Sequence, residues 1–126
     1  MKILATDMDG TFLDHLGAYD KARLENLLDA CEVKDYVFTV ASGRALLALE
    51  ELFDGFVDRI AIIAENGALV QYKGEVLFES KLEPKDYLEI ADTTLALPTC
   101  EGILLSGRRG AYAPNDADPA YLKAME

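Results

Sequence analysis

Three short apolar runs in the first half of the chain predict buried β-strands. Ile3–Thr6 is a nearly continuous apolar run, Tyr36–Ala41 is rich in β-branched and aromatic residues, and Ile60–Ala64 is aliphatic throughout. Continuous rather than alternating hydrophobicity is typical of strands in a parallel sheet that is covered on both faces. Each run stops at a polar residue, where we expect a loop.

Helical periodicity fills the two intervals between these runs. From Tyr19 to Cys31, apolar residues recur three and four positions apart on one face, and charged residues lie mostly elsewhere. Ala45–Phe53 is also predicted to be a helix, with Ser42 placed to cap it. The alternation of strands and helices predicts an α/β fold whose parallel strands are joined by right-handed crossovers.

After Gly67 the pattern changes to hairpins that flank one helix. The expected elements are a hairpin of Ala68–Tyr72 and Val76–Glu79, a helix of Pro84–Leu95, and a hairpin of Ile103–Ser106 and Ala111–Ala113. We therefore place a domain boundary near Ser80, with one domain over residues 1–80 and the next over residues 81–126.

The composition narrows the classes of partner. The chain is 51% hydrophobic, which is enough to form a core, and its formal net charge is −11. Such a negative protein would repel nucleic acid, so we expect no nucleic-acid partner. The same charge opposes a phosphorylated ligand at long range. A phosphate site here must therefore be locally positive, through a metal ion or backbone N–H groups.

The sequence also indicates a cytoplasmic protein that has no membrane segment. Its two cysteines, Cys31 and Cys100, are far apart and form neither a disulfide framework nor a metal-binding pair. Asp7 follows the amino terminus too closely for a signal peptide. The longest apolar runs, Ala45–Leu49 and Ile60–Ala64, are far too short to span a bilayer.

The first candidate site, Asp7–Thr11, follows the first predicted strand, and ligands of open α/β sheets bind at this end of a strand. Asp7 and Asp9 could hold one hard cation through oxygen ligands, and an ionised aspartate can act as a nucleophile. A second carboxyl group can donate a proton and later accept one, while Gly10 permits a sharp turn. A plain turn and a metal site without chemistry stay open as alternatives.

Two further candidate loops follow the second and third predicted strands. Ser42-Gly43-Arg44 combines a hydroxyl with free N–H groups before a helix, an arrangement that suits phosphate. Glu65-Asn66-Gly67 could place an amide near the same edge. An ordinary helix cap and a tight turn are the alternative interpretations of these two segments. Because adjacent parallel strands end at the same edge of a sheet, we expect the three loops to converge.

Together these loops resemble the haloacid-dehalogenase superfamily, specifically the Cof-type sugar phosphatases with a class IIB α/β cap. The segments that carry the resemblance are Thr6–Leu13, Val40–Arg44, Ala64–Val70 and, for the first cap hairpin, Leu105–Tyr112. The resemblance implies a Rossmann-like core with an incomplete sheet of parallel strands plus a hairpin, followed by part of an α/β cap. It also implies Mg²⁺ as the cofactor and small phosphate monoesters, notably sugar phosphates, as substrates.

The resemblance further implies a role for each matching residue. Asp7 would attack phosphorus and become an aspartyl phosphate, and Asp9 would act as the general acid and then as the base. Asp7 and the backbone carbonyl of Asp9 would ligate Mg²⁺. The remaining candidates are Thr11, Ser42 and Gly43 for the phosphoryl group, and Arg44 and Asn66 for the substrate or a hinge.

The chain departs from the family pattern near its end. Family members carry a lysine motif and a Gly-Asp-x-x-x-Asp motif after the cap, and neither stands before Glu126. The acidic segment Asn115–Asp118 lacks the glycine and is expected to be a solvated loop. We therefore expect an incomplete copy of the site, weakly active or inactive alone. The family's first strand is central, so here its open side would lie bare.

Two alternatives to a phosphatase remain at this point. One is a non-catalytic remnant that binds phosphate or Mg²⁺, and the other is a subunit whose site is completed by another chain. A bare apolar strand edge favours self-association or pairing with another chain, so the expected partners include a second polypeptide as well as a small phosphorylated metabolite.

Overall fold

The computed structural model describes residues 1–114 of the 126-residue chain. The predicted acidic loop, Asn115–Asp118, lies outside the described residues. The chain forms two compact units, one of residues Met1–Ser80 and one that begins at Lys81. The candidate loops that follow the three predicted parallel strands all belong to the first unit.

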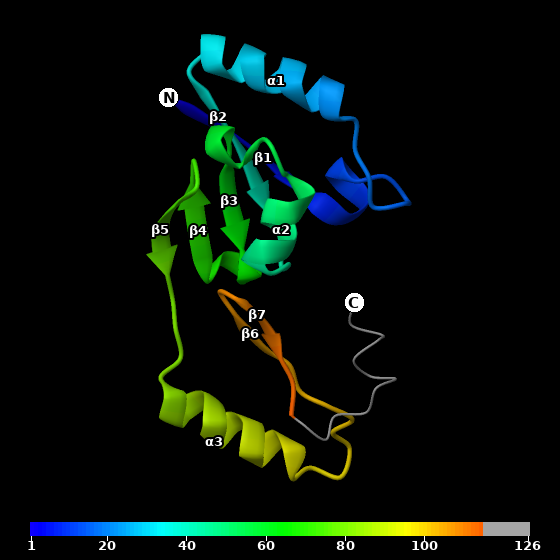
Figure 1. The fold of residues 1–126 in the computed structure, drawn as a ribbon, viewed down its shortest axis with the longest axis vertical. Coiled ribbons are helices and arrows are strands. Elements are labelled where there is room, and N and C mark those ends of the chain that lie inside the picture. The colour runs from blue at the N-terminus through cyan, green and yellow to red at the C-terminus, as the bar shows by residue number, and fades with distance from the viewer. Residues whose placement is uncertain (115–126) are drawn as a thin grey trace. The chain divides into compact units, whose positions relative to one another are not determined.

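The first unit is built on a five-stranded sheet, shown in Figure 1. Its strands are β1 (Lys2–Asp7), β2 (Tyr36–Ala41), β3 (Ala61–Ala64), β4 (Leu69–Tyr72) and β5 (Glu75–Glu79). They are hydrogen-bonded in chain order, with β1, β2 and β3 parallel and β4 and β5 antiparallel. Lys73 and Gly74 have φ of +52° and +80°, as a two-residue hairpin turn requires. The predicted α/β fold, with parallel strands and a hairpin, is confirmed.

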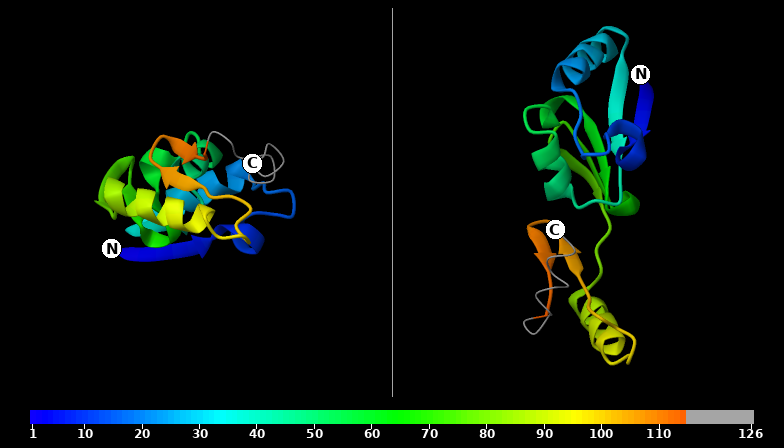
Figure 2. Two further views of the ribbon diagram at one scale, coloured as in Figure 1. Left: turned by 90° about the horizontal axis from the view of Figure 1, so that it is seen from below. Right: turned by 90° about the vertical axis from the view of Figure 1, so that its right-hand side faces the viewer.

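Helices α1 (Lys21–Val33) and α2 (Leu46–Leu52) join the parallel strands. Because these strands follow one another in chain order, right-handed crossovers place both helices on the same face of the sheet. Figure 2 shows α1 and α2 together on one side of it. Leu24 and Leu28 of α1 and Leu49 of α2 are buried, so each helix turns its apolar stripe inward, as the periodicity predicts.

The prediction that Ser42 caps the second helix is wrong. Helix α2 begins at Leu46, and Ala45 occupies the N-cap position without a side-chain hydrogen bond. The hydroxyl of Ser42 instead accepts a hydrogen bond from the backbone N–H of Arg44 at 3.2 Å. Residues 43 and 44 form a bend between β2 and the helix, which moves the serine a full turn away from the helix start.

The expectation that β1 is a buried strand is also wrong. Ile3 is 68% exposed and Leu4 is 41% exposed. The reason is that β1 lies at the edge of the sheet and pairs with β2 alone among the described strands, which confirms the bare open side expected for it. An apolar run therefore predicts a strand here, but its neighbours in the sheet decide whether that strand is buried.

The core of the first unit lies between the sheet and its two helices, and an aromatic cluster anchors it. Phe12 packs against Tyr19, Phe38 and Phe53, with ring centroids 5.3, 5.7 and 5.9 Å away. The Tyr19 hydroxyl donates a hydrogen bond to the Leu52 carbonyl at 2.8 Å. Burial, and to a lesser extent the charge of nearby Asp54, raise the pKa of Tyr19, so its hydroxyl stays protonated and can donate this hydrogen bond.

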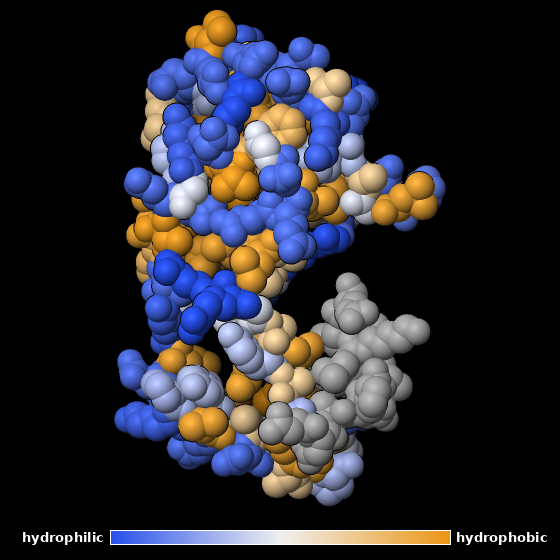
Figure 3. Space-filling model, in the orientation of Figure 1, coloured by the Kyte–Doolittle hydropathy of each residue, from blue (hydrophilic) through white to orange (hydrophobic). Residues whose placement is uncertain are grey.

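The outer face of α1 is polar. On the face shown in Figure 3, hydrophilic side chains dominate over this helix.

The second unit contains α3 (Pro84–Leu95) and a hairpin of β6 (Leu105–Gly107) and β7 (Gly110–Tyr112). Pro84 stands in the first turn of α3, where its missing N–H costs nothing. The predicted helix has the observed bounds, whereas the first hairpin strand begins at Leu105 instead of Ile103. Within residues 1–114, no helix is long and apolar enough to cross a membrane.

The buried position of Phe53 leads to a stability prediction. Phe53 is fully buried, whereas Phe78 on β5 is 53% exposed. We expect Phe53→Ala to lower the free energy of unfolding by about 3–5 kcal/mol, because it removes buried apolar surface and leaves a cavity. Urea unfolding of both variants measures this, with Phe78→Ala as the matched control. Equal losses in the two variants would contradict the assigned core.

Candidate functional site

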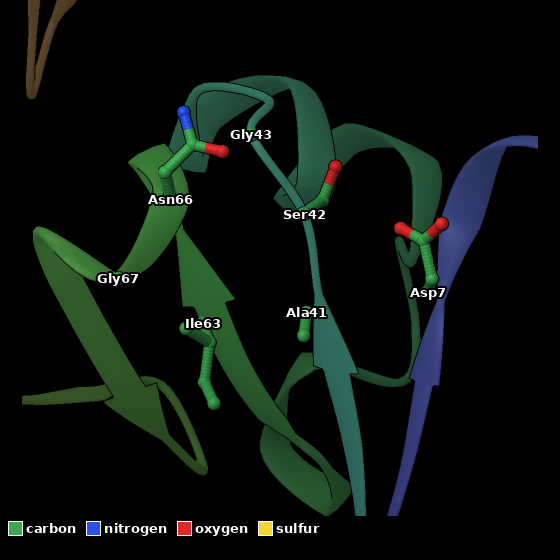
Figure 4. Close-up of a pocket in the computed structure, with 7 residues that line it drawn as sticks. All are labelled: Asp7, Ala41, Ser42, Gly43, Ile63, Asn66 and Gly67. Atoms are coloured by element: carbon green, nitrogen blue, oxygen red, sulfur yellow. The ribbon is translucent and has the colours of Figure 1, made fainter.

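The loops after β1, β2 and β3 meet around one hollow at the carboxyl edge of the sheet. The parallel register aligns Asp7 with Ala41, and Ala41 with Ile63. The hollow has a volume of about 350 Å³, and Figure 4 shows its lining. The lining residues are Asp7, Ala41, Ser42, Gly43, Ile63, Asn66 and Gly67. The structure thus brings together four of the predicted site residues, Asp7, Ser42, Gly43 and Asn66.

A wide turn over Met8–Phe12 holds Asp7 and Asp9 at the surface. The Leu13 N–H donates a hydrogen bond to the Met8 carbonyl at 2.9 Å, which closes the turn. Met8 is fully buried, and Phe12 joins the aromatic cluster of the core. Gly10 has φ of +74°, a conformation that glycine adopts without strain. With its apolar residues anchored inside, the turn leaves Asp7, Asp9 and Thr11 exposed.

Backbone hydrogen bonds tie the second loop to the third. The Ser42 N–H donates to the Ile63 carbonyl at 2.9 Å, and the Ser42 carbonyl accepts from the Asn66 N–H at 3.2 Å. The space between the loops is narrow at Gly43. A Cβ atom added to Gly43 would lie 2.9 Å from the Asn66 Oδ1. Glycine is therefore the residue that lets the Asn66 amide lie over this stretch of backbone.

The third loop contains consecutive residues with positive φ. Glu65, Asn66 and Gly67 have φ of +53°, +54° and +95°. Asparagine and glycine tolerate this region, but glutamate seldom adopts it. The Glu65 N–H donates to the Arg44 carbonyl at 3.1 Å, which helps to hold the conformation. Backbone strain of this kind is often stored at functional sites.

Asp9 does not share the hollow in the way the sequence suggested. Its carboxylate is held by Arg44, whose Nη2 lies 2.5 Å from Oδ1 and whose Nε lies 3.2 Å from Oδ2. Asp9, Thr11 and Arg44 are absent from the lining of the hollow. The difference arises because the turn after β1 directs the Asp9 side chain toward the Arg44 guanidinium, which lies in the loop after β2.

The first loop offers oxygen ligands, the kind that a hard cation prefers, but only a few of them. Within the part of the chain that the structure describes, no group of three or more His, Cys, Asp or Glu residues is arranged to hold a metal ion. The Asp7 carboxylate and the Asp9 backbone carbonyl remain as oxygen donors. Mg²⁺ commonly takes one or two carboxylates and keeps several waters, so such a pair could hold it in part.

Some residues of the site were not singled out from the sequence. Ala41 and Ile63 line the hollow, and Ile63 also accepts the hydrogen bond from Ser42. Ala41 is the last residue of β2, and Ile63 is the last but one of β3. These positions could have indicated them, because the ends of parallel strands border such a site.

The chain is similar to known proteins in sequence and in fold. A model of the haloacid dehalogenase-like hydrolase family matches residues 4–125. An Escherichia coli K12 protein, 5-amino-6-(5-phospho-D-ribitylamino)uracil phosphatase YbjI, is 31% identical over the whole chain. SMU.1108c from Streptococcus mutans UA159 is 30% identical in sequence, and its crystal structure matches 98% of the chain with a TM-score of 0.86. The structure of the HAD subclass IIB sugar phosphatase BT4131 has the same fold, with a TM-score of 0.62 at 23% identity over 92% of the chain.

The similarity covers only part of each relative. The chain spans 46% of the Escherichia coli phosphatase, 46% of the Streptococcus protein and 45% of BT4131. The family resemblance predicted from the three loops is confirmed by the match over nearly the whole chain. The chain therefore belongs to the family of haloacid dehalogenase-like hydrolases.

Proposed function

We propose that this chain contributes to the Mg²⁺-dependent hydrolysis of small phosphate monoesters, with Asp7 as the nucleophile. The observation that carries the proposal is the hollow at the carboxyl edge, where the Asp7 carboxylate faces the Ser42 hydroxyl and the Gly43 backbone. Hydroxyl and N–H groups beside a carboxylate suit a phosphoryl group that is transferred to that carboxylate. The Escherichia coli relative is named as a phosphatase of a phosphorylated ribityl compound, which supports sugar-like phosphates as substrates.

The reaction would proceed in two steps. A carboxylate oxygen of Asp7 forms a bond to phosphorus while the ester P–O bond breaks, and the Asp9 carboxyl group gives its proton to the leaving oxygen. A water oxygen then attacks the aspartyl phosphate, Asp9 accepts the water proton, and Asp7 is released with inorganic phosphate. Ser42 and Gly43 would orient the phosphoryl group, and Thr11 would support the loop. Mg²⁺, held by Asp7 and the Asp9 carbonyl, would supply positive charge against the phosphate oxygens.

The same geometry leads us to propose that the chain alone is a weak catalyst. In the described part of the chain, no lysine or arginine lines the hollow. Phosphoryl transfer depends on neutralising charge on several sides of the phosphoryl group. The formal net charge of −11 adds long-range repulsion. We also propose that the unit after Ser80 is the start of an α/β cap. The cytoplasmic location expected from the sequence is a further proposal.

Phosphorylation of Asp7 is the direct test. We expect the chain, incubated with Mg²⁺ and acetyl phosphate, to gain one phosphoryl group on Asp7, because acetate leaves without needing a proton. Asp7→Asn should lower the rate of labelling on the order of 10³-fold or more, since it removes the nucleophile. Mass spectrometry after acid quenching locates the label. Asp58→Asn is the matched control, because Asp58 precedes β3 and lies at its amino end. Labelling that survives Asp7→Asn would refute the proposal.

The role of Gly43 leads to a second test. We expect Gly43→Ala to change the free energy of unfolding by less than about 1 kcal/mol, because the exposed Asn66 amide can rotate away from the new methyl group. Labelling of Asp7 should slow, because the methyl group and the displaced amide crowd the backbone that would receive the phosphoryl group. In the Asn66→Gly background the amide is gone, so Gly43→Ala should slow labelling less. A wild-type labelling rate in Gly43→Ala would contradict a phosphate-binding role for Gly43.

A second candidate, a subunit completed by another chain, is favoured by one observation. β1 lies at the edge of the described sheet and ends at Asp7, yet Ile3 and Leu4 are exposed. An exposed apolar edge strand can pair with another chain, so we propose self-association through this edge as the alternative state. Pairing there would bring a neighbouring strand end close to the nucleophile.

Sedimentation velocity over a concentration series tests the pairing. We expect wild-type chain to associate as concentration rises, and Ile3→Lys to shift that association to higher concentration, because lysine on an edge strand opposes pairing. Leu16→Lys is the control, since Leu16 is also exposed but lies in the loop before α1. If the wild-type chain stayed monomeric throughout, or both variants behaved alike, the edge would not be the contact.

A further inference from the structure

Arg44 makes the only charged contact to Asp9 among those identified in the described part of the chain. Its Nη2 lies 2.5 Å from one carboxylate oxygen of Asp9, and its Nε lies 3.2 Å from the other. A guanidinium that contacts both oxygens restricts rotation of the carboxylate more than a single hydrogen bond does. The two residues are far apart in sequence, so the contact joins the loop after β1 to the loop after β2.

The backbone of Arg44 makes two further connections. Its N–H donates a hydrogen bond to the Ser42 hydroxyl at 3.2 Å, within the loop after β2. Its carbonyl accepts from the Glu65 N–H at 3.1 Å, in the strained loop after β3. The backbone that carries the guanidinium is therefore itself anchored, so the side chain extends toward Asp9 from a fixed point. One residue contacts all three loops of the site.

Stability does not explain this ion pair. The Arg44 and Asp9 side chains are 38% and 65% exposed, and exposed ion pairs contribute little to folding. Arg59 offers a comparison away from the hollow. Its Nη2 and Nε contact Asp29 and Glu32 of α1 at 2.7 and 2.8 Å. The contacts of Arg59 fasten a helix to the turn before β3, whereas the Arg44 pair joins the loops that follow two neighbouring parallel strands.

We propose that Arg44 is a positioning residue that holds the Asp9 carboxylate in one orientation for proton transfer. The proposal rests on the proposed function, in which Asp9 protonates the leaving oxygen and then accepts a proton from water. A group that transfers protons acts fully only when it is held within hydrogen-bond reach of the reacting oxygen. In this arrangement Arg44 acts through Asp9, as a structural link to the acid–base group.

The orientation of Asp9 can be measured without any activity. Three-bond NMR couplings across the Cα–Cβ bond of Asp9, in isotope-labelled chain, report its side-chain rotamer. We expect a single rotamer in the wild-type chain and averaged couplings in Arg44→Gln. Arg59→Gln is the matched control and should leave the Asp9 couplings unchanged. A single, unchanged Asp9 rotamer in Arg44→Gln would overturn the proposal.

A two-step kinetic measurement tests the consequence for catalysis. After Asp7 is labelled with acetyl phosphate and Mg²⁺, the donor is removed and loss of the phosphoryl group is followed. Labelling needs no proton on acetate, so Arg44→Gln should leave its rate unchanged. Loss of the label needs Asp9 to accept the water proton, so Arg44→Gln should slow it about 10- to 100-fold. Arg59→Gln should slow neither step.

A double-mutant cycle separates positioning from a general structural effect. If Arg44 acts through Asp9, Arg44→Gln should have no further effect on label loss in the Asp9→Asn background. An additional slowing there, or an equal slowing of labelling and label loss in Arg44→Gln alone, would overturn the proposal. A wild-type chain that gains no label on Asp7 would contradict the phosphatase proposal instead, and the couplings would still decide whether Arg44 holds Asp9.

Discussion

The parallel register of β1, β2 and β3 places Asp7, Ala41 and Ile63 in one row across the sheet. The candidate site residues lie in this row or in the loops that come after it in the sequence. Side chains and loops from widely separated parts of the sequence converge because parallel strands end at the same edge. The two helices that connect these strands both cover the same face of the sheet, so they do not block the loops at its carboxyl edge. A shift of one residue in any pair would turn the bordering residues to the other face of the sheet.

The loops at this edge are linked to one another by hydrogen bonds. The Ser42 and Arg44 carbonyls accept backbone hydrogen bonds from the loop after β3, and the Arg44 guanidinium reaches the loop after β1. The absence of a side chain at Gly43 gives room for the Asn66 amide. These hydrogen bonds can hold Glu65 in its left-handed conformation. In an isolated turn, the residue would relax out of this strained conformation.

Charge is the main constraint on what the site can do. The chain is strongly acidic, and the Arg44 guanidinium, in the loop after β2, is paired with Asp9. Positive potential for a phosphoryl group therefore has to come from backbone N–H groups and from a bound cation.

The sequence by itself determined the α/β class, the bounds of β2 and α3, and the three loops, because strand and helix periodicity and short polar motifs are local properties. The family resemblance indicated a bare open side for β1, but only the tertiary structure decided that Ile3 and Leu4 are exposed, since burial depends on neighbouring strands that hydropathy does not specify. It also decided that Ser42 bonds within its own bend instead of capping α2, and that Arg44 reaches Asp9. Those partners lie in different loops or depend on the exact path of the backbone, and no spacing along one chain encodes which long side chain meets which carboxylate.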